Sequence, residues 1–337
     1  MPIAGFTRFR RHQWGKQSAF ASNTTATRRI PWRGPIVVDP LRTDPDVDVG
    51  SLDPVLAPHA GAATYEAALD ITAYAYDDAP YAYAALVKGG VTPTGATAKT
   101  WVFQAASLTA DDFDYFTDEW GDDVTSDYIV GGSGVGDSFE IGFGDDLGVF
   151  TGSLDMVYAR ANLCAGPTGG LVIDDTPQWI YGADTEVYLD TVYTAIGTTK
   201  LVDAVHGATV RVSNNLDRKR YANGSNTRFQ LAGYGRGARE IEVELVLAKT
   251  TATIAEACTL DDTPVPKRFI ELKTTSPEII TGATPYSHSI RIPARLMSRS
   301  DGEIGGNSTI TLTYHGFYDA DLGYAFRAVI VNTLAAL

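Results

Sequence analysis

Alternating apolar and polar positions predict two half-buried β-strands in corresponding parts of the chain. In TYEAALDITA every second residue from position 65 to 71 is apolar, and in REIEVELVLA the same is true from 241 to 247. Because successive side chains of a strand point to opposite faces, each stretch should bury one face and expose the other. The two patterns lie 176 residues apart, which is about half the chain.

The elements predicted after these two strands follow one order. Each strand leads to a short helix, a further strand and a final run of hairpin strands. These elements cover 78–90, 99–107 and 137–161 in the first half, and 250–262, 267–276 and 287–321 in the second. The shared order predicts an internal duplication. The alternative is that two unrelated β domains share alternating strands, as any two such domains do.

The predicted fold is mainly β, with two tandem β-sandwich or β-barrel domains that each carry one short α-helix. The predicted parts are a basic N-terminal arm (1–35), a first β domain (36–160), a Gly- and Pro-rich linker (161–180) and a second β domain (181–337). At 337 residues the chain is long for one hydrophobic core, which favours two.

Charge is distributed unevenly along the chain. The formal net charge is −14, yet residues 1–34 carry seven bases and no acid, whereas residues 39–155 carry 22 acids and three bases. A basic arm therefore precedes a strongly acidic half, and two such segments attract one another between copies. The acidic surface argues against tight binding to nucleic acid.

The segment DDFDYFTDEWGDD, residues 111–123, places seven carboxylates and four aromatic rings in thirteen positions. An EF-hand calcium loop that starts at Asp112 would need Gly at its sixth position and Glu at its twelfth, where this chain has Thr117 and Asp123. Acid–base catalysis needs two carboxylates in different environments, and a run of adjacent acids does not provide them. We therefore expect a solvated acidic face without a metal.

No motif in the chain indicates catalysis. GGSGVG at 131–136 precedes a strand rather than a helix and lacks the residues of a nucleophile elbow or a phosphate loop, so we expect a connection between strands there. The five histidines are scattered, and Cys164 and Cys258 lack the spacing of a zinc site. We expect no enzyme activity, no metal and no cofactor.

Export and membrane insertion are not predicted either. The N-terminus lacks the apolar region of a signal peptide, and no stretch approaches the roughly 18 apolar residues that a membrane-spanning helix needs. We expect reduced cysteines and no membrane partner.

Five stretches with loose sequence patterns occur in a fixed order along almost the whole chain. They are FTRFRRHQWGKQSAFASNTTATRRIPWRG, GAATYEAALDITA, TWVFQAAS, DDFDYFTDEWGD and TLTYHGFYDADLGYAFRAVIVNTL. Together and in this order, they resemble the tail tube (major tail) proteins of long-tailed bacteriophages.

The resemblance implies a virion structural protein, assembled in the host cytoplasm, whose stacked rings form the hollow phage tail tube for DNA passage. Members of that family join the β-sheets of neighbouring subunits into an inner barrel, and single-domain relatives make six-subunit rings. A duplicated chain would fill two of those places, which implies a trimeric ring with pseudo-sixfold symmetry. The implied partners are further copies of the chain, the tape measure protein and phage DNA in the lumen without specific binding, and the tail tip and tail terminator proteins.

Candidate site residues follow from these implications. A lumen through which DNA slides should repel phosphates, so acids on the alternating strands are the first candidates for its lining. These acids are Glu66, Asp70, Glu240, Glu242 and Glu244. Candidate contacts between subunits or rings are the bases of the arm and the acids of the 111–123 segment: Arg8, Arg10, Arg11, Arg28, Arg29, Arg33, Asp111, Asp112, Asp114, Asp118, Glu119, Asp122 and Asp123.

Two other functions remain open. A distal tail or baseplate ring protein would form one ring and no filament. A calcium-assisted carbohydrate-binding β-sandwich module could use Trp101, Tyr115 and Trp120 together with nearby acids. Calcium would then raise the melting temperature, because a ligand that binds only the folded state stabilises it.

Overall fold

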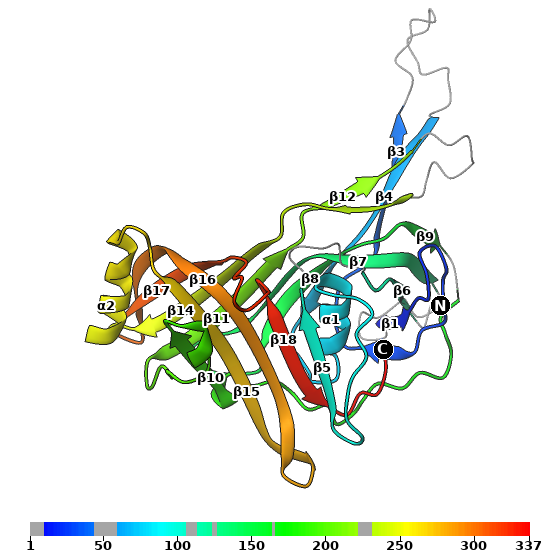
Figure 1. The fold of residues 1–337 in the computed structure, drawn as a ribbon. Coiled ribbons are helices and arrows are strands. Elements are labelled where there is room, and N and C mark those ends of the chain that lie inside the picture. The colour runs from blue at the N-terminus through cyan, green and yellow to red at the C-terminus, as the bar shows by residue number, and fades with distance from the viewer. Residues whose placement is uncertain (1–9, 44–58, 106–112, 123–126, 164–165, 222–230) are drawn as a thin grey trace, which may run out of the picture.

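The computed structural model describes residues 10–43, 59–105, 113–122, 127–163, 166–221 and 231–337. Within these ranges the chain is mainly β, with 18 strands and two short α-helices. Sixteen of the strands belong to one antiparallel sheet, and β12 and β13 form a separate pair (Figure 1). None of the helices in this described part is long and apolar enough to cross a membrane.

The elements follow one another from β1 to β18. The first half contains β1 (Arg10–Lys16), β2 (Arg28–Ile30), β3 (Val37–Thr43), β4 (His59–Ile71), α1 (Ala79–Leu86), β5 (Lys99–Gln104), β6 (Phe116–Asp122), β7 (Asp127–Phe143), β8 (Thr151–Val157) and β9 (Arg160–Leu163). The second half contains β10 (Thr185–Asp190), β11 (Val205–Ser213), β12 (Leu216–Lys219), β13 (Gly233–Arg236), β14 (Glu240–Ala248), α2 (Thr251–Cys258), β15 (Lys267–Thr281), β16 (Thr284–Ile304), β17 (Asn307–Gly316) and β18 (Arg327–Asn332).

The strands of the two halves pair in the same order. In the first half the order is β1–β6–β7–β8–β4–β3, and β9 also pairs with β7. In the second half it is β10–β15–β16–β17–β14–β11, and β18 also pairs with β16. The halves join where β7 pairs with β11, and again where β5 pairs with β18.

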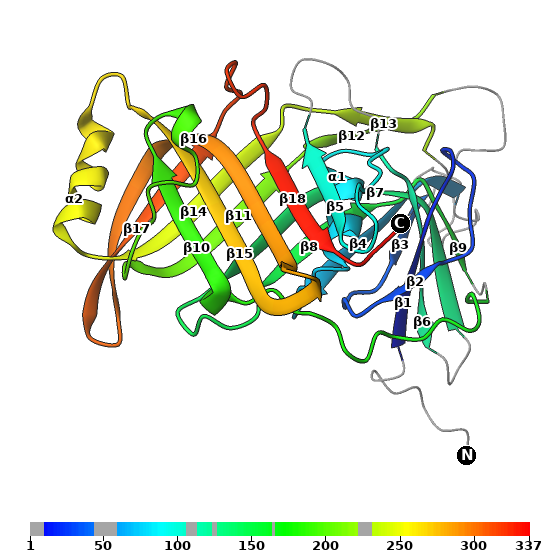
Figure 2. The same cartoon turned by 60° about the horizontal axis from the view of Figure 1, so that its bottom comes forward.

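One long strand in each half carries a β-bulge at the corresponding place. The β7–β8 register shifts between Gly136 and Ser138, and the β16–β17 register shifts between Leu296 and Ser298. A bulge bends its strand, so each of these strands changes neighbours there. On the N-terminal side of its bulge β7 pairs mainly with β6 and β9, and on the C-terminal side with β8 and β11. In the same way β16 pairs with β15 and β18 before its bulge and with β17 after it. Figure 2 shows β10, β15, β18 and β5 in front of the layer that contains β14, β11, β7 and β8.

The main hydrophobic core is continuous through both halves, rather than divided into the two cores that the chain length favours, and a small second cluster contains Val157, Ala159 and Leu231. The centre of the main core is α1, whose eight residues are all buried. The Tyr83 hydroxyl of α1 lies 2.8 Å from Nε2 of His288 on β16, so the helix of one half contacts a strand of the other. α2 is less covered, since only Thr253 and Ala257 are buried there.

The alternating patterns identified the two central strands correctly. The apolar positions from 65 to 71 on β4 and from 241 to 247 on β14 are buried, and both predicted helices are present. The strand predicted at 99–107 differs in its role: β5 pairs with β18, and β6 is the partner of β7 in the way that β15 is the partner of β16.

The sequence predicted a connection between strands at the glycine-rich segment 131–136. This prediction was wrong, because the segment lies in the middle of β7. The reason is the ring of Tyr158, which lies against the strand. A Cβ atom added to Gly131 or Gly134 would approach that ring to 2.6 or 2.7 Å, which is too close. Glycine is therefore needed for packing there rather than for a turn.

Candidate functional site

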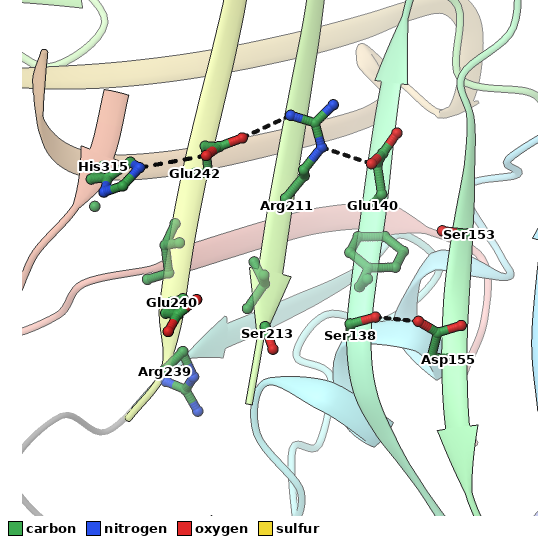
Figure 3. A pocket seen from close by; sticks show the side chains of 14 residues that line it. Ser138, Glu140, Ser153, Asp155, Arg211, Ser213, Arg239, Glu240, Glu242 and His315 are labelled. Atoms are coloured by element: carbon green, nitrogen blue, oxygen red, sulfur yellow. Dashed lines mark hydrogen bonds and ion pairs between the residues drawn. The ribbon is translucent and has the colours of Figure 1, made fainter. Parts of the chain in front are cut away.

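A row of polar and charged residues crosses the face of the sheet that points away from the core (Figure 3). Its members lie directly opposite one another on adjacent strands: Asp70 on β4, Ser153 on β8, Glu140 on β7, Arg211 on β11, Glu242 on β14 and His315 on β17. Opposed residues of neighbouring strands share a face, so the row runs without interruption from one half of the chain to the other. We call this surface the polar face.

Arg211 is the centre of the polar face. Its guanidinium is 2.7 Å from Glu140, 2.7 Å from Glu242 and 3.2 Å from Glu244. The hydrogen bond to Glu140, with those to the other two carboxylates, raises the pKa of Arg211, so it stays charged. Because Glu140 lies on β7 and the other two acids on β14, Arg211 bridges the junction between the halves.

All five predicted lumen acids lie on the polar face. Glu240, Glu242 and Glu244 project from β14, and the cross-strand pairing places Glu66 and Asp70 of β4 on the same side. Glu66 forms an ion pair with Arg218. Whether this face lines a lumen stays a prediction.

Sequence reasoning missed two acids of the same face, Glu140 and Asp155. They line a hollow of about 780 Å³ beside Arg211 and Arg239. The signal was present, because DSFEIGF alternates as regularly as the strands that were recognised.

The acidic segment is not a solvated face in its described part. Asp118 is fully buried, with Oδ1 3.1 Å from Nδ1 of His12 and Oδ2 accepting a hydrogen bond from the Tyr158 hydroxyl. Burial by itself lowers the pKa of His12, but the Asp118 carboxylate outweighs this effect and the pKa is raised.

The neighbouring acids of this segment are also held inside the chain. Glu119 is buried and accepts hydrogen bonds from Gln13 and Thr168, and Asp114 is buried beside Lys16 at 2.8 Å. Asp122 is half-buried on β6. Asp111, Asp112 and Asp123 lie outside the described residues. Asp114, Asp118 and Glu119 are therefore unavailable as contacts between subunits in this conformation.

The basic arm is part of the fold from residue 10 onward, not a detached strap. β1 pairs with β6 and fully buries Trp14, and Arg28 forms a 2.7 Å ion pair with the buried Asp78. Burial raises the pKa of Asp78 to about 6, although Arg28 opposes this shift. Arg8 lies outside the described residues.

The remaining arginines of the arm surround a groove of about 700 Å³, which we call the basic groove. Its lining includes Arg10, Arg11, Arg29, Arg33, Gly34 and Trp120. The Arg10 guanidinium lies over the Trp120 ring, 5.4 Å from its centre.

Two of the open strand edges lie at opposite ends of the layer β16–β17–β14–β11–β7–β8–β4–β3. In the described part of the chain, β3 pairs with β4 alone. β16 pairs from Leu296 to Ile304 with β17 on one side, and no described strand pairs with its other side. An unpaired strand edge is a ready template for another chain.

Trp101, one of the three aromatic residues suggested for sugar binding, is placed unfavourably for it. Trp101 is buried, stacks on Phe103, and donates from its indole nitrogen to Asn332. Among the described residues, no group of three or more His, Cys, Asp or Glu side chains is arranged to hold a metal ion.

Comparisons with known proteins add little. No protein-family model matches the chain, and no curated protein matches its sequence. Among solved structures, the SPP1 tail tube, determined by solid-state NMR and cryo-EM, aligns with 47% of this chain and 81% of its own, at 13% identity and a TM-score of 0.29. A TM-score this low does not establish a shared fold.

Proposed function

We propose that this chain is a virion structural protein that assembles head to tail into closed rings, and that these rings stack into the hollow tail tube of a long-tailed bacteriophage. The observation that carries the proposal is that β7 and β11 join the halves edge to edge, while the corresponding edges, on β16 and β3, are open in the described part of the chain. The order of sequence patterns that resembles tail tube proteins supports the same function.

The proposed contact between chains repeats the strand pairing of the internal β7–β11 junction. β7 and β11 pair through six consecutive residues of each strand. In the shared pairing order β16 takes the place of β7, and β3 takes the place of β11. The open edge of β16 therefore complements the open edge of β3 on another copy. Such a heterologous contact closes into a ring when its rotation divides a full turn evenly.

The repeated strand order and the matching bulges support an internal duplication. Each chain would then supply two similar places in a ring. If the ring has the six places implied by the resemblance, three chains fill it with pseudo-sixfold symmetry. The polar face would line the lumen, with the tape measure protein and DNA inside, and its acids would keep phosphates from binding.

Negative-stain electron microscopy of the purified protein, with sedimentation over a range of concentrations, tests this function. Long tubes of stacked rings are the expected product. Single rings that never stack would favour a distal tail or baseplate protein. A chain that stays monomeric at all concentrations, and melts at a higher temperature with calcium, would favour the carbohydrate-binding alternative.

A further inference from the structure

The basic groove lies next to the open edge of β3. Arg33 and Gly34 line the groove and are separated from the start of β3 only by Pro35 and Ile36. Arg33 also pairs through its backbone with Asp70, which continues the β3–β4 ladder. A strand that docks on the β3 edge would therefore end at the groove.

The other open edge ends in an acidic hairpin. β16 carries Asp301 and Glu303 just before the turn at Gly305 and Gly306, and both acids are exposed. Asp301 contacts Lys249 at 3.1 Å and Arg299 at 3.3 Å. Glu303 is the last charged residue before the turn.

The matching bulges relate β16 to β7. Gly136 before the first bulge corresponds to Leu296 before the second, an offset of 160 residues. By the same offset Glu140 corresponds to Ser300, and Phe143 corresponds to Glu303.

Cross-strand neighbours relate β3 to β11. Met156 of β8 lies opposite Gly136, and the next residue, Val157, lies opposite Glu66 of β4. Tyr314 of β17 lies opposite Leu296, and the next residue, His315, lies opposite Glu242 of β14. Glu66 and Glu242 therefore occupy corresponding places. Val37 lies opposite Glu66 and Arg211 lies opposite Glu242. Val37 therefore corresponds to Arg211, and Gly34 corresponds to Ala208.

The internal junction then fixes the register between chains. Glu140 lies opposite Arg211 and Phe143 lies opposite Ala208. Transferred to the open edges, Ser300 of one copy lies opposite Val37 of the next, and Glu303 lies opposite Gly34, at the basic groove.

We infer that the basic groove receives the acidic end of the β16–β17 hairpin from a second copy of this chain, in this register. The inference rests on the proposed head-to-tail assembly and adds the residues and the charge pairing that hold it. The hairpin end supplies carboxylates, and the groove supplies guanidinium groups.

A change of chemistry between the two junctions supports this pairing. Inside the chain, the ring of Phe143 lies against Gly182, just before β10. At the junction between chains the corresponding residue is Glu303, and the corresponding place is the start of β1, where Arg10 lies. The apolar contact within the chain is thus replaced by an acid that faces bases, and opposite charges steer association and fix the register.

Disulfide cross-linking tests the register. In a Cys164→Ser/Cys258→Ser background, Ser300→Cys and Val37→Cys should link neighbouring chains, because opposed residues of paired strands lie within reach of a disulfide. Non-reducing gels should show covalent dimers and trimers. Ser300→Cys with Asp39→Cys, two residues further along the same strand face, is the matched control and should link far less.

Charge removal tests the groove. Glu303→Gln should raise the concentration needed for assembly about tenfold, as should the double change Arg10→Gln/Arg33→Gln. Combining all three substitutions should raise this concentration no further than either change alone, because the acid and the two bases interact with each other. Glu278→Gln, an exposed acid at the end of the other long hairpin, should leave assembly unchanged.

The outcomes separate this inference from the proposed function. The inference would be overturned, with the proposed function intact, if the Ser300→Cys/Val37→Cys variant formed tubes without a disulfide between these positions. The same holds if Glu303→Gln left the concentration needed for assembly unchanged. If the unaltered protein never assembles, the proposed function fails and the inference fails with it. Melting temperatures equal to that of the unaltered protein show that each variant is folded.

Discussion

Glycine residues in β7 make room for a buried aromatic ring. The Tyr158 ring covers Gly131 and Gly134, and its hydroxyl donates a hydrogen bond to the fully buried Asp118. Asp118 also contacts His12, so one carboxylate connects β6 with β1 and with the residue that follows β8. A buried carboxylate is stable only when it is paired in this way.

Replacement of Gly134 by Ala tests this packing. The new Cβ would lie 2.7 Å from the Tyr158 ring, so the ring must move, and the free energy of unfolding should fall by about 1–3 kcal/mol. Gly144→Ala is the control, since its nearest atom is 3.9 Å away. Chemical denaturation of the two variants measures the difference, and equal stabilities would show that the ring moves without cost.

His288 should make the fold sensitive to acid. It is buried against Tyr74, Tyr83 and Phe150, and burial lowers its pKa from 6.5 to about 3. Below pH 6.5 the unfolded chain therefore binds a proton that the folded chain does not. This lowers the free energy of unfolding by up to ~1.4 kcal/mol per pH unit as the pH falls toward 3.

The variant His288→Gln isolates this effect, because other groups also titrate in the same range. Denaturation midpoints of the variant and the unaltered protein, measured at several pH values between 7 and 4, should converge as the pH falls. A constant difference between the two would contradict a neutral buried imidazole.

At the scale of elements, Arg211 connects three strands across the junction between the halves. It contacts Glu140 on β7 and Glu242 and Glu244 on β14 while it projects from β11. The groups are partly exposed, so solvent weakens each interaction. Without the guanidinium, the three carboxylates would repel one another.

Arg211→Gln should therefore destabilise the fold by about 0.5–1 kcal/mol at low ionic strength, and by less at 1 M salt, where the Debye length is about 3 Å. Lys200→Gln, which removes a single exposed pair with Glu186, should have a smaller effect. Thermal melting at both salt concentrations measures this. A loss for Arg211→Gln that does not change with salt would indicate a packing role instead of an electrostatic one.

Elements with a regular pattern were predictable from the sequence, and elements shaped by tertiary contacts were not. β4, β14 and both helices follow from local periodicity. β6 was missed because its acids are satisfied by distant partners such as His12 and Gln13. β7 was interrupted in the prediction because its glycines suggest a turn until the position of Tyr158 is known.

The candidate site was predictable to a similar extent. The strand acids on the polar face are visible in the sequence, but Arg211 gains its role only because β11 lies between β7 and β14. The bases of the arm were expected to contact other subunits or rings. A deletion of residues 2–34 would remove Trp14, Ile30 and Trp32, which are all buried in the core, so it would test folding rather than assembly.

At the scale of the whole molecule, the proposed function makes the sheet one segment of a ring. The β7–β11 junction is made within the chain, and the edges that would make the corresponding junction between chains, on β16 and β3, lie at opposite ends of one layer of strands. The polar face continues across the internal junction, so ring closure would continue it around a lumen. The two places would be similar in fold and different in charge, since Glu140 and Arg211 correspond to Ser300 and Val37.

End-on cryo-EM class averages of the assembled protein test this account most directly. Three chains per ring are expected, with threefold symmetry and six similar lobes, because each chain would fill two places. A ring of six chains, or an assembly whose contacts leave the edges of β3 and β16 unpaired, would contradict it.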